Sequence, residues 1–134
     1  MISTKDKYAI NAMIDIAIYY SNNGYVTTKD ISKRQNLSIK YLEQVIAHLV
    51  KANLLKSYRG ANGGYGLVKK PEEYNALEII KAVSGEIIVD NEPGACSKLI
   101  NGYLETITNY FESIKLSDLV LDYQTSIGAG LYYI

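Results

Sequence analysis

The residues of this chain that could do chemistry are cations and glycines beside a predicted turn. Arg59 is followed by Gly60-Ala61-Asn62-Gly63-Gly64-Tyr65-Gly66-Leu67, and Lys56 and Tyr58 come just before it. Because Asn and Gly tolerate positive φ angles, the pattern predicts a β-hairpin with its turn at Asn62-Gly63-Gly64. A hairpin with a cationic base and a tip free of side chains can lie close to a polyanion, and the chemistry it indicates is phosphate binding.

The charge of the chain is divided unevenly between its halves. The 134 residues hold 14 Lys and Arg and 14 Asp and Glu, for a formal net charge of zero. Residues 1–70 carry eleven of the cations and four of the acids, so this half is +7, and residues 71–134 are −7. Such asymmetry indicates that the basic half meets a polyanion. The alternative, that two solvated faces differ by chance, stays open.

Three predicted helices must position the hairpin. A helix capped by Ser3 or Thr4 is expected to run to Tyr20, where Ser21-Asn22-Asn23-Gly24 stops it, and Thr27 or Thr28 is expected to cap a short second helix. After a turn at Asn36-Leu37, Ser38 is expected to cap a third helix over residues 38–52. Two helices joined by a tight turn are typical of a helix-turn-helix, and a hairpin that follows is the wing of a winged helix. The residues of the third helix that are expected to face the core are Leu42, Val45, Ile46 and Leu49.

The other side of the third helix is predicted to face DNA. Tyr41 and Gln44 suit base edges, and Glu43 could accept from cytosine. For Tyr41 and Glu43, a half-buried ring and a solvated carboxylate remain the alternatives. The predicted DNA contacts are Lys5, Thr28, Lys29, Ser38, Lys40, Tyr41, Glu43, Gln44, Arg59, Gly63, Gly64 and Tyr65.

The second half of the chain predicts helices for assembly. A connector over residues 71–74 precedes a helix over 76–83 that Gly85 ends, and a loop over 86–95 follows. The next helix, about 97–114, has a broad apolar face that a second copy of the chain would cover. A last helix from Ser117 leads to a flexible glycine hinge before Tyr132, Tyr133 and Ile134. The predicted dimerisation residues are Leu99, Tyr103, Ile107, Tyr110, Phe111 and Ile114.

The predicted fold class is mainly α with a small β-hairpin wing: a winged helix-turn-helix DNA-binding domain with a long dimerisation helix. The domains expected are 1–85 with the wing at about 55–69, loop and dimerisation helices over 86–127, and a flexible tail over 128–134. No signal peptide or membrane-spanning run is visible, so a cytoplasmic protein is expected. No catalytic triad, carboxylate pair or phosphate loop emerges, so no enzyme is predicted.

The sequence resembles the Rrf2 family of bacterial winged-helix regulators across almost its whole length. The segments that carry the resemblance are Ser3-Thr4-Lys5, Tyr8-Ala9, Ile31-Ser32-Lys33-Arg34-Gln35, Tyr41-Leu42-Glu43-Gln44, Leu49, Gly63-Gly64-Tyr65-Gly66-Leu67, Ile79-Ile80-Lys81-Ala82-Val83 and Leu116-Ser117-Asp118-Leu119. The resemblance implies a dimeric transcription factor that binds a palindromic operator in double-stranded DNA.

Many members of the family hold an iron–sulfur cluster through three closely spaced cysteines before the dimer helix. This chain has only Cys96 there, and its one histidine, His48, lies on the predicted recognition helix. The first helix offers Tyr8, Ala9, Asn11 and Ala12 where other members recruit ligands. We therefore predict no cluster, no metal site and no cofactor.

The branch of the family without a cluster includes a repressor of cysteine metabolism that works with cysteine synthase (O-acetylserine sulfhydrylase). Partners of that enzyme insert a C-terminal isoleucine carboxylate into its active site, and Tyr132-Tyr133-Ile134 fits this mode. The resemblance thus implies cysteine synthase as a partner. Two alternatives stay open: a redox signal at Cys96, whose place near a helix N-terminus favours a thiolate, and an adaptor that docks proteins without binding DNA.

Overall fold

The first helix shows why this sequence folds as it does locally. In the computed structural model, which describes residues 2–20, 24–61 and 63–132, Ser3 caps α1 with a capping box: Asp6 N–H donates to Ser3 Oγ, and Ser3 N–H donates to the Asp6 carboxylate at 2.8 Å. Apolar residues at helical spacing then bury one side of α1. The elements in order are α1 (Thr4–Tyr19), α2 (Thr28–Gln35), α3 (Ile39–Lys51), β1 (Leu55–Tyr58), β2 (Gly64–Leu67), the 3₁₀ helix η1 (Pro71–Glu73), α4 (Ala76–Ser84), α5 (Ala95–Ser113) and α6 (Leu116–Tyr132).

The helix-turn-helix forms where the sequence predicts it. Thr27 caps α2 and Ser38 caps α3. Between them Asn36 adopts a left-handed conformation with φ of 54°, which turns the chain sharply. The four residues predicted to face inward from α3 are all buried, namely Leu42, Val45, Ile46 and Leu49. The expected stop after α1 at residues 21–23 lies outside the described residues.

The wing is an antiparallel pair in which Leu55 faces Leu67 and Tyr58 faces Gly64. Val26, between α1 and α2, adds a bridge to Tyr65 through two backbone hydrogen bonds of 2.8 and 2.9 Å. The predicted turn needs one correction. The positive φ angles fall at Gly60 (112°) and Gly64 (149°) and not at Gly63, and Asn62 lies outside the described residues.

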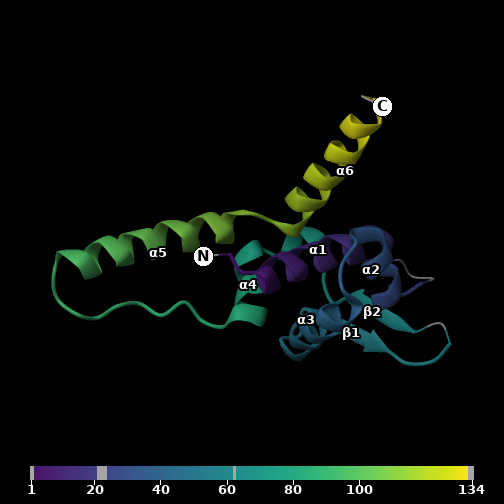
Figure 1. Cartoon of the computed structure of the whole chain (residues 1–134), viewed down its shortest axis with the longest axis horizontal. Coiled ribbons are helices and arrows are strands. Elements are labelled where there is room, and N and C mark those ends of the chain that lie inside the picture. Colours follow the sequence, from purple (N-terminus) through teal and green to yellow (C-terminus); the bar gives the residue numbers. More distant parts are fainter. Residues whose placement is uncertain (1, 21–23, 62, 133–134) are drawn as a thin grey trace.

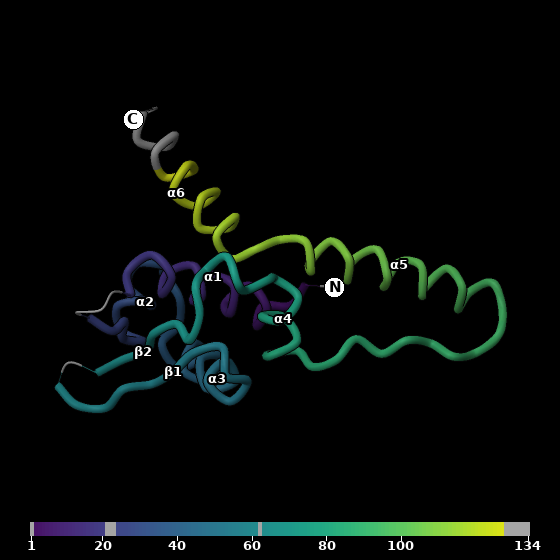
Figure 2. Tube along the Cα trace, turned by 180° about the vertical axis from the view of Figure 1, so that it is seen from behind, coloured from purple at the N-terminus to yellow at the C-terminus, as the bar shows by residue number. Residues whose placement is uncertain are grey.

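Helix α5 extends away from a body made of α1–α4 and the hairpin, and α6 projects from the same junction in another direction (Figure 1). Figure 2 shows the same arrangement from behind, with the hairpin and the far end of α5 on opposite sides of the body. The junction is fixed to the body, because Ala76 N–H donates to Ile114 O at 2.8 Å and Leu116 N–H donates to Tyr74 O at 3.0 Å.

The first turns of α6 belong to the same core as the body. Leu116 is fully buried, and Leu119, Val120 and Tyr123 pack against the core. Helix α6 continues to Tyr132, where the sequence predicts a flexible tail over residues 128–134. Tyr133 and Ile134, the end of the predicted docking tail, lie outside the described residues. Among the described helices, none combines the length and apolar character needed to cross a membrane.

Candidate nucleic-acid interface

The wing and the start of α2 form the two walls of a cleft of about 500 Å³. Its position follows from the Val26 bridge, which holds the segment before α2 against β2. The cleft gathers five of the predicted DNA contacts from two parts of the chain. The residues that line it are Thr27, Thr28, Ser57, Tyr58, Arg59, Gly60, Gly63, Gly64 and Tyr65.

Helix α3, which packs against α2 and β1, presents polar residues to solvent. Lys40, Glu43, Gln44 and His48 are exposed. These side chains offer a cation, a hydrogen-bond acceptor and an amide that can both donate and accept, which is the chemistry that base edges and phosphates require. Lys29, in the first turn of α2, is exposed as well.

Tyr41 has a packing partner that the sequence did not reveal. Its ring lies edge-on to the ring of Tyr8 in α1, with the centroids 4.8 Å apart. The Tyr8 hydroxyl also accepts the Ser38 N–H at 3.1 Å, at the start of α3. Tyr8 therefore holds the start of α3, the helix that carries several of the predicted contacts. Lys5 is exposed and lies one turn before Tyr8 on α1.

Three tyrosines stack beside the wing. The rings of Tyr25 and Tyr58 are 3.6 Å apart and nearly parallel, and Tyr20 lies 5.9 Å from Tyr25. Lys56 stands near the rings of Tyr58 and Tyr20. Its hydrogen bond to Tyr58 raises the pKa of Lys56 and lowers the pKa of the Tyr58 hydroxyl. We call Tyr20, Tyr25 and Tyr58 the tyrosine stack.

Sequence reasoning missed the tyrosine stack because its members come from three separate segments. The one signal for the stack in the sequence is the glycine at position 66. At Gly66 a Cβ atom would come within 2.5 Å of the Tyr20 ring, so the absence of a side chain there makes room for the stack. Desolvation by the neighbouring rings raises the pKa of Tyr25.

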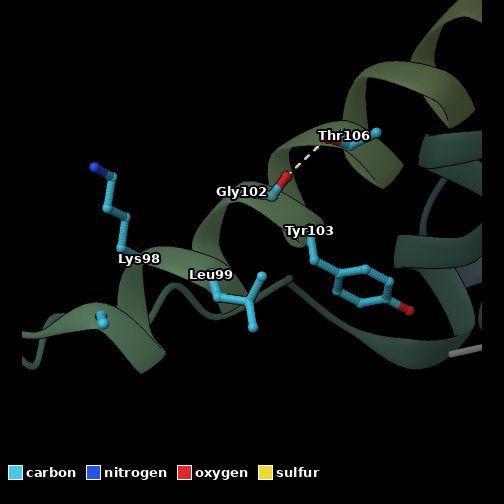
Figure 3. Close-up of a pocket in the computed structure, with 6 residues that line it drawn as sticks. Lys98, Leu99, Gly102, Tyr103 and Thr106 are labelled. Atoms are coloured by element: carbon cyan, nitrogen blue, oxygen red, sulfur yellow. Dashed lines mark hydrogen bonds between the residues drawn. The ribbon is translucent and has the colours of Figure 1, made fainter.

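The predicted dimerisation residues divide into two groups on α5. Leu99, Tyr103 and Tyr110 are exposed by 72%, 47% and 62%, and Leu99 and Tyr103 point to the same side of the helix, away from Lys98 (Figure 3). The second group, which is half-buried, comprises Ile107, Phe111 and Ile114. Ile107 and Phe111 line a 440 Å³ cavity between α5 and the ends of α1 and α4.

Cys96 is exposed at the second position of α5. The loop before it is held by Asp90, whose carboxylate accepts hydrogen bonds from Ser97 Oγ at 2.8 Å and from Glu92 N–H at 3.0 Å. The Glu92 N–H and the Ser97 hydroxyl lower the pKa of Asp90 below the usual range of an aspartate.

The sequence model of one family, described as "Iron-dependent Transcriptional regulator", matches residues 2–122 of this chain. The chain belongs to the Rrf2 family. This Rrf2 protein is therefore a helix-turn-helix transcriptional regulator, as the resemblance implied.

Individual Rrf2 relatives agree in sequence and in fold. The HTH-type transcriptional regulator CymR of Bacillus subtilis is 35% identical over 138 residues, which cover 99% of each chain. A solved structure of CymR, described as the global cysteine regulator of B. subtilis, is 34% identical with a TM-score of 0.77 and covers 90% of this chain and 95% of that one. The structure of T. potens IscR is 36% identical with a TM-score of 0.81, and the match covers 94% of this chain and 90% of that one. The oxidised form of Staphylococcus aureus CymR gives 0.76 at 36% identity, with 90% and 95% covered. The predicted winged-helix fold is confirmed.

The family description implies iron, and the residues here do not fit a cluster held by several thiolates. The chain has one cysteine and one histidine. Cys96 starts α5, whereas His48 lies in α3. Within residues 2–20, 24–61 and 63–132, no group of three or more His, Cys, Asp or Glu side chains is placed to hold a metal ion. No iron-dependent step follows from these residues.

Proposed function

We propose that this Rrf2 protein is a homodimeric, non-enzymatic repressor that binds palindromic operator DNA. The observation that carries the proposal is the cleft between the wing and α2, where Thr28, Arg59, Gly63, Gly64 and Tyr65 meet beside the exposed face of α3. The surplus of cations over acids in residues 1–70 supports a polyanionic partner for this side.

In the proposed complex α3 enters the major groove, and its exposed residues Lys40, Glu43 and Gln44 read or flank the bases. The cleft takes the neighbouring backbone, with Arg59 on phosphate or in the minor groove. The apolar face of α5 joins two copies, which places two recognition helices on the two halves of a palindrome.

The DNA part of the proposal is tested by the salt dependence of binding. Arg59→Ala should weaken operator affinity and reduce the slope of log K against log salt by about 1, because one phosphate contact is lost. Lys98→Ala is the matched control: it removes an exposed cation from α5 and should leave the slope unchanged. An unchanged slope in Arg59→Ala would remove the wing from the phosphate contacts. A wild type that binds no DNA would leave the adaptor alternative.

We further propose that the regulated genes serve cysteine metabolism and that cysteine synthase is the partner. Similarity to CymR over 99% of both chains supports this, since a CymR structure is described as that of a global cysteine regulator. Helix α6 runs away from the body toward the C-terminus, where Tyr133 and Ile134 follow it (Figure 1). In this proposal the Ile134 carboxylate enters the enzyme, the bound enzyme stabilises the DNA complex, and O-acetylserine competes with the tail and releases the operator.

A calorimetric titration of the full-length protein into cysteine synthase tests the partner. Deleting Ile134 should abolish binding while operator affinity without the enzyme stays unchanged. A second variant, with one glycine added after Ile134, keeps every side chain but moves the carboxylate, and it should also fail to bind. Binding that survives both changes would exclude docking through the tail.

A second signal is favoured by one observation: Cys96 is exposed, and a relative, S. aureus CymR, has been solved in an oxidised form. Hydrogen peroxide would oxidise the Cys96 thiol to a sulfenic acid, with water as the other product. Peroxide should then change operator affinity in the wild type and have no effect in Cys96→Ser. Equal responses in both proteins would exclude this residue as the sensor.

A further inference from the structure

Helix α1 contains a carboxylate that is fully buried in the core. Asp15 lies between Ile14 and Ile16 and is 0% exposed. It receives two hydrogen bonds from Arg34, at the end of α2: Nη2 donates to Oδ1 at 2.8 Å and Nε donates to Oδ2 at 3.0 Å. The guanidinium stacks over the ring of Tyr19, 3.9 Å from its centroid. Hydrogen bonding to Asp15 raises the pKa of Arg34, so the guanidinium stays charged.

A third element joins this pair through Gln35. The Gln35 Nε2 donates to Asp15 Oδ2 at 3.0 Å and lies 3.3 Å from the hydroxyl oxygen of Tyr123 in α6. Gln35 is the last residue of α2 and immediately precedes the left-handed Asn36 of the helix-turn-helix. The last residue of the first helix of the motif therefore contacts both α1 and α6.

These hydrogen bonds determine the orientation of α2 more than they add to the stability of the fold. Asp15 is fully buried, whereas the Arg34 side chain is 32% exposed. The desolvation of the buried carboxylate offsets much of its attraction to the guanidinium, so the ion pair adds little to stability. Hydrogen bonds, unlike apolar contacts, have fixed directions. The network of Asp15, Arg34, Gln35 and Tyr123 therefore defines how α2 lies against α1 and α6.

Helix α6 joins this network to a part of the chain that lies outside the body. Its start is fixed in the core by the fully buried Leu116, and Tyr123 lies two turns further on. Past its first turns the helix leaves the body (Figures 1 and 2). The hydrogen bond between Gln35 and Tyr123 is thus a direct link between α6 and the first helix of the helix-turn-helix.

We propose that Tyr123 and Gln35 are positioning residues for DNA recognition, which connect α6 to the turn of the helix-turn-helix through the buried Asp15. The inference rests on the proposed function and adds the route by which an event at the C-terminus reaches the recognition helix. An operator-bound α3 and a partner-bound tail then favour the same position of Tyr123, and each strengthens the other.

The test measures affinity for an operator selected from random DNA and for unrelated DNA, using the full-length protein. Tyr123→Phe keeps the ring in the core and removes the hydroxyl. It should weaken operator binding about threefold to tenfold, the effect of one lost hydrogen bond, while affinity for unrelated DNA stays within twofold. Tyr19→Phe, which removes a hydroxyl outside the network, should change neither. A purely structural role would lower both affinities together and reduce the melting temperature.

A double-mutant cycle with Gln35→Ala separates coupling from independent effects. Because both side chains act through one contact, the double variant should bind the operator no more weakly than Gln35→Ala alone. The inference would be overturned if the losses of operator affinity in the two single variants multiplied in the double variant. It would also be overturned if Tyr123→Phe left the ratio of the affinity for the operator to the affinity for unrelated DNA unchanged. A wild type that selects no operator would reject the proposed function itself, and the inference with it.

The effect of cysteine synthase on operator affinity provides a second readout of the role of Tyr123. Tyr123→Phe should bind the enzyme with unchanged affinity, because residues 132–134 are intact, yet lose the effect of the enzyme on operator affinity. A variant that keeps the full effect would show that the signal bypasses Tyr123. A wild type that binds its operator but ignores the enzyme would reject only the partner, and the double-mutant cycle would still decide the role of Tyr123.

Discussion

At the scale of single residues, the wing depends on the absence of a side chain at Gly66. The Tyr20 ring occupies the space that a side chain there would need, and Tyr25 and Tyr58 continue the tyrosine stack toward the tip. Arg59 follows Tyr58 directly, so the stack sets where this cation stands. The aromatic contacts are each worth about 0.5–1.5 kcal/mol beyond the area they bury.

We expect Gly66→Ala to displace Tyr20 and to destabilise the protein by about 1–3 kcal/mol, the usual cost of overpacking. Operator affinity should fall as well, because the displaced stack no longer holds the wing against α2. Denaturant unfolding and DNA titration measure the two effects. Gly24→Ala is the control, since a Cβ at Gly24 meets nothing within 4 Å. Equal unfolding midpoints for the two variants would show that the stack yields without cost.

A second residue, Tyr74, ties the wing to the segment that follows it. Its ring is buried, and its hydroxyl donates to Leu54 O at 2.7 Å and accepts the Val68 N–H at 2.9 Å. Leu54 comes just before β1 and Val68 just after β2, so one hydroxyl joins both ends of the hairpin. Burial raises the pKa of Tyr74, which keeps this hydroxyl protonated.

Tyr74→Phe should destabilise the protein by about 1–3 kcal/mol, because it leaves the buried Leu54 carbonyl and the part-buried Val68 amide without their partner. Tyr19→Phe, at a ring that is 48% exposed, should change stability by less than about 0.5 kcal/mol. Hydrogen exchange of the Val68 amide gives a direct readout, and it should accelerate only in Tyr74→Phe. Unchanged protection of that amide would show that other contacts hold the base of the hairpin.

At the scale of elements, the sequence predicted what local chemistry decides. Ser38 caps α3 as expected, and Ser3 and Thr27, each one of two predicted candidates, cap α1 and α2, since capping needs only a side-chain oxygen near the free N–H groups of the first turn. The hairpin was predicted for a similar reason. Its glycine angles were partly wrong because several turn types suit a run rich in Gly and Asn, and the paired strands decide among them.

Contacts between distant segments could not be predicted in this way. Asp15 and Tyr123 meet Gln35 across separations of 20 and 88 residues, and nothing in the local pattern at any of the three indicates a partner. The tyrosine stack was hidden for the same reason. The helical course of α6 past Gly128 was not predicted; glycine lowers helix propensity by only about 1 kcal/mol relative to alanine, which a long helix can absorb.

At the scale of the whole molecule, the exposed face of α5 is the feature that a single chain does not explain. Leu99 is 72% exposed on a helix that leaves the body, and Tyr103 and Tyr110 continue the same apolar surface. Exposed apolar surface of this kind marks an interaction site. Because a palindromic operator needs two recognition helices, a second copy is the occupant that fits the proposed function.

Leu99→Glu should therefore convert the protein to a folded monomer. In a single chain the carboxylate would stand in water at little cost, whereas a two-fold interface would bury two unpaired charges, each costing several kcal/mol. The dimer should weaken more than about 100-fold, and operator affinity should fall toward that of a half-site. Lys98→Glu, which points away from Leu99 (Figure 3), should remain dimeric. Sedimentation velocity distinguishes the two, and a Leu99→Glu protein that stays dimeric with full operator affinity would place the interface elsewhere.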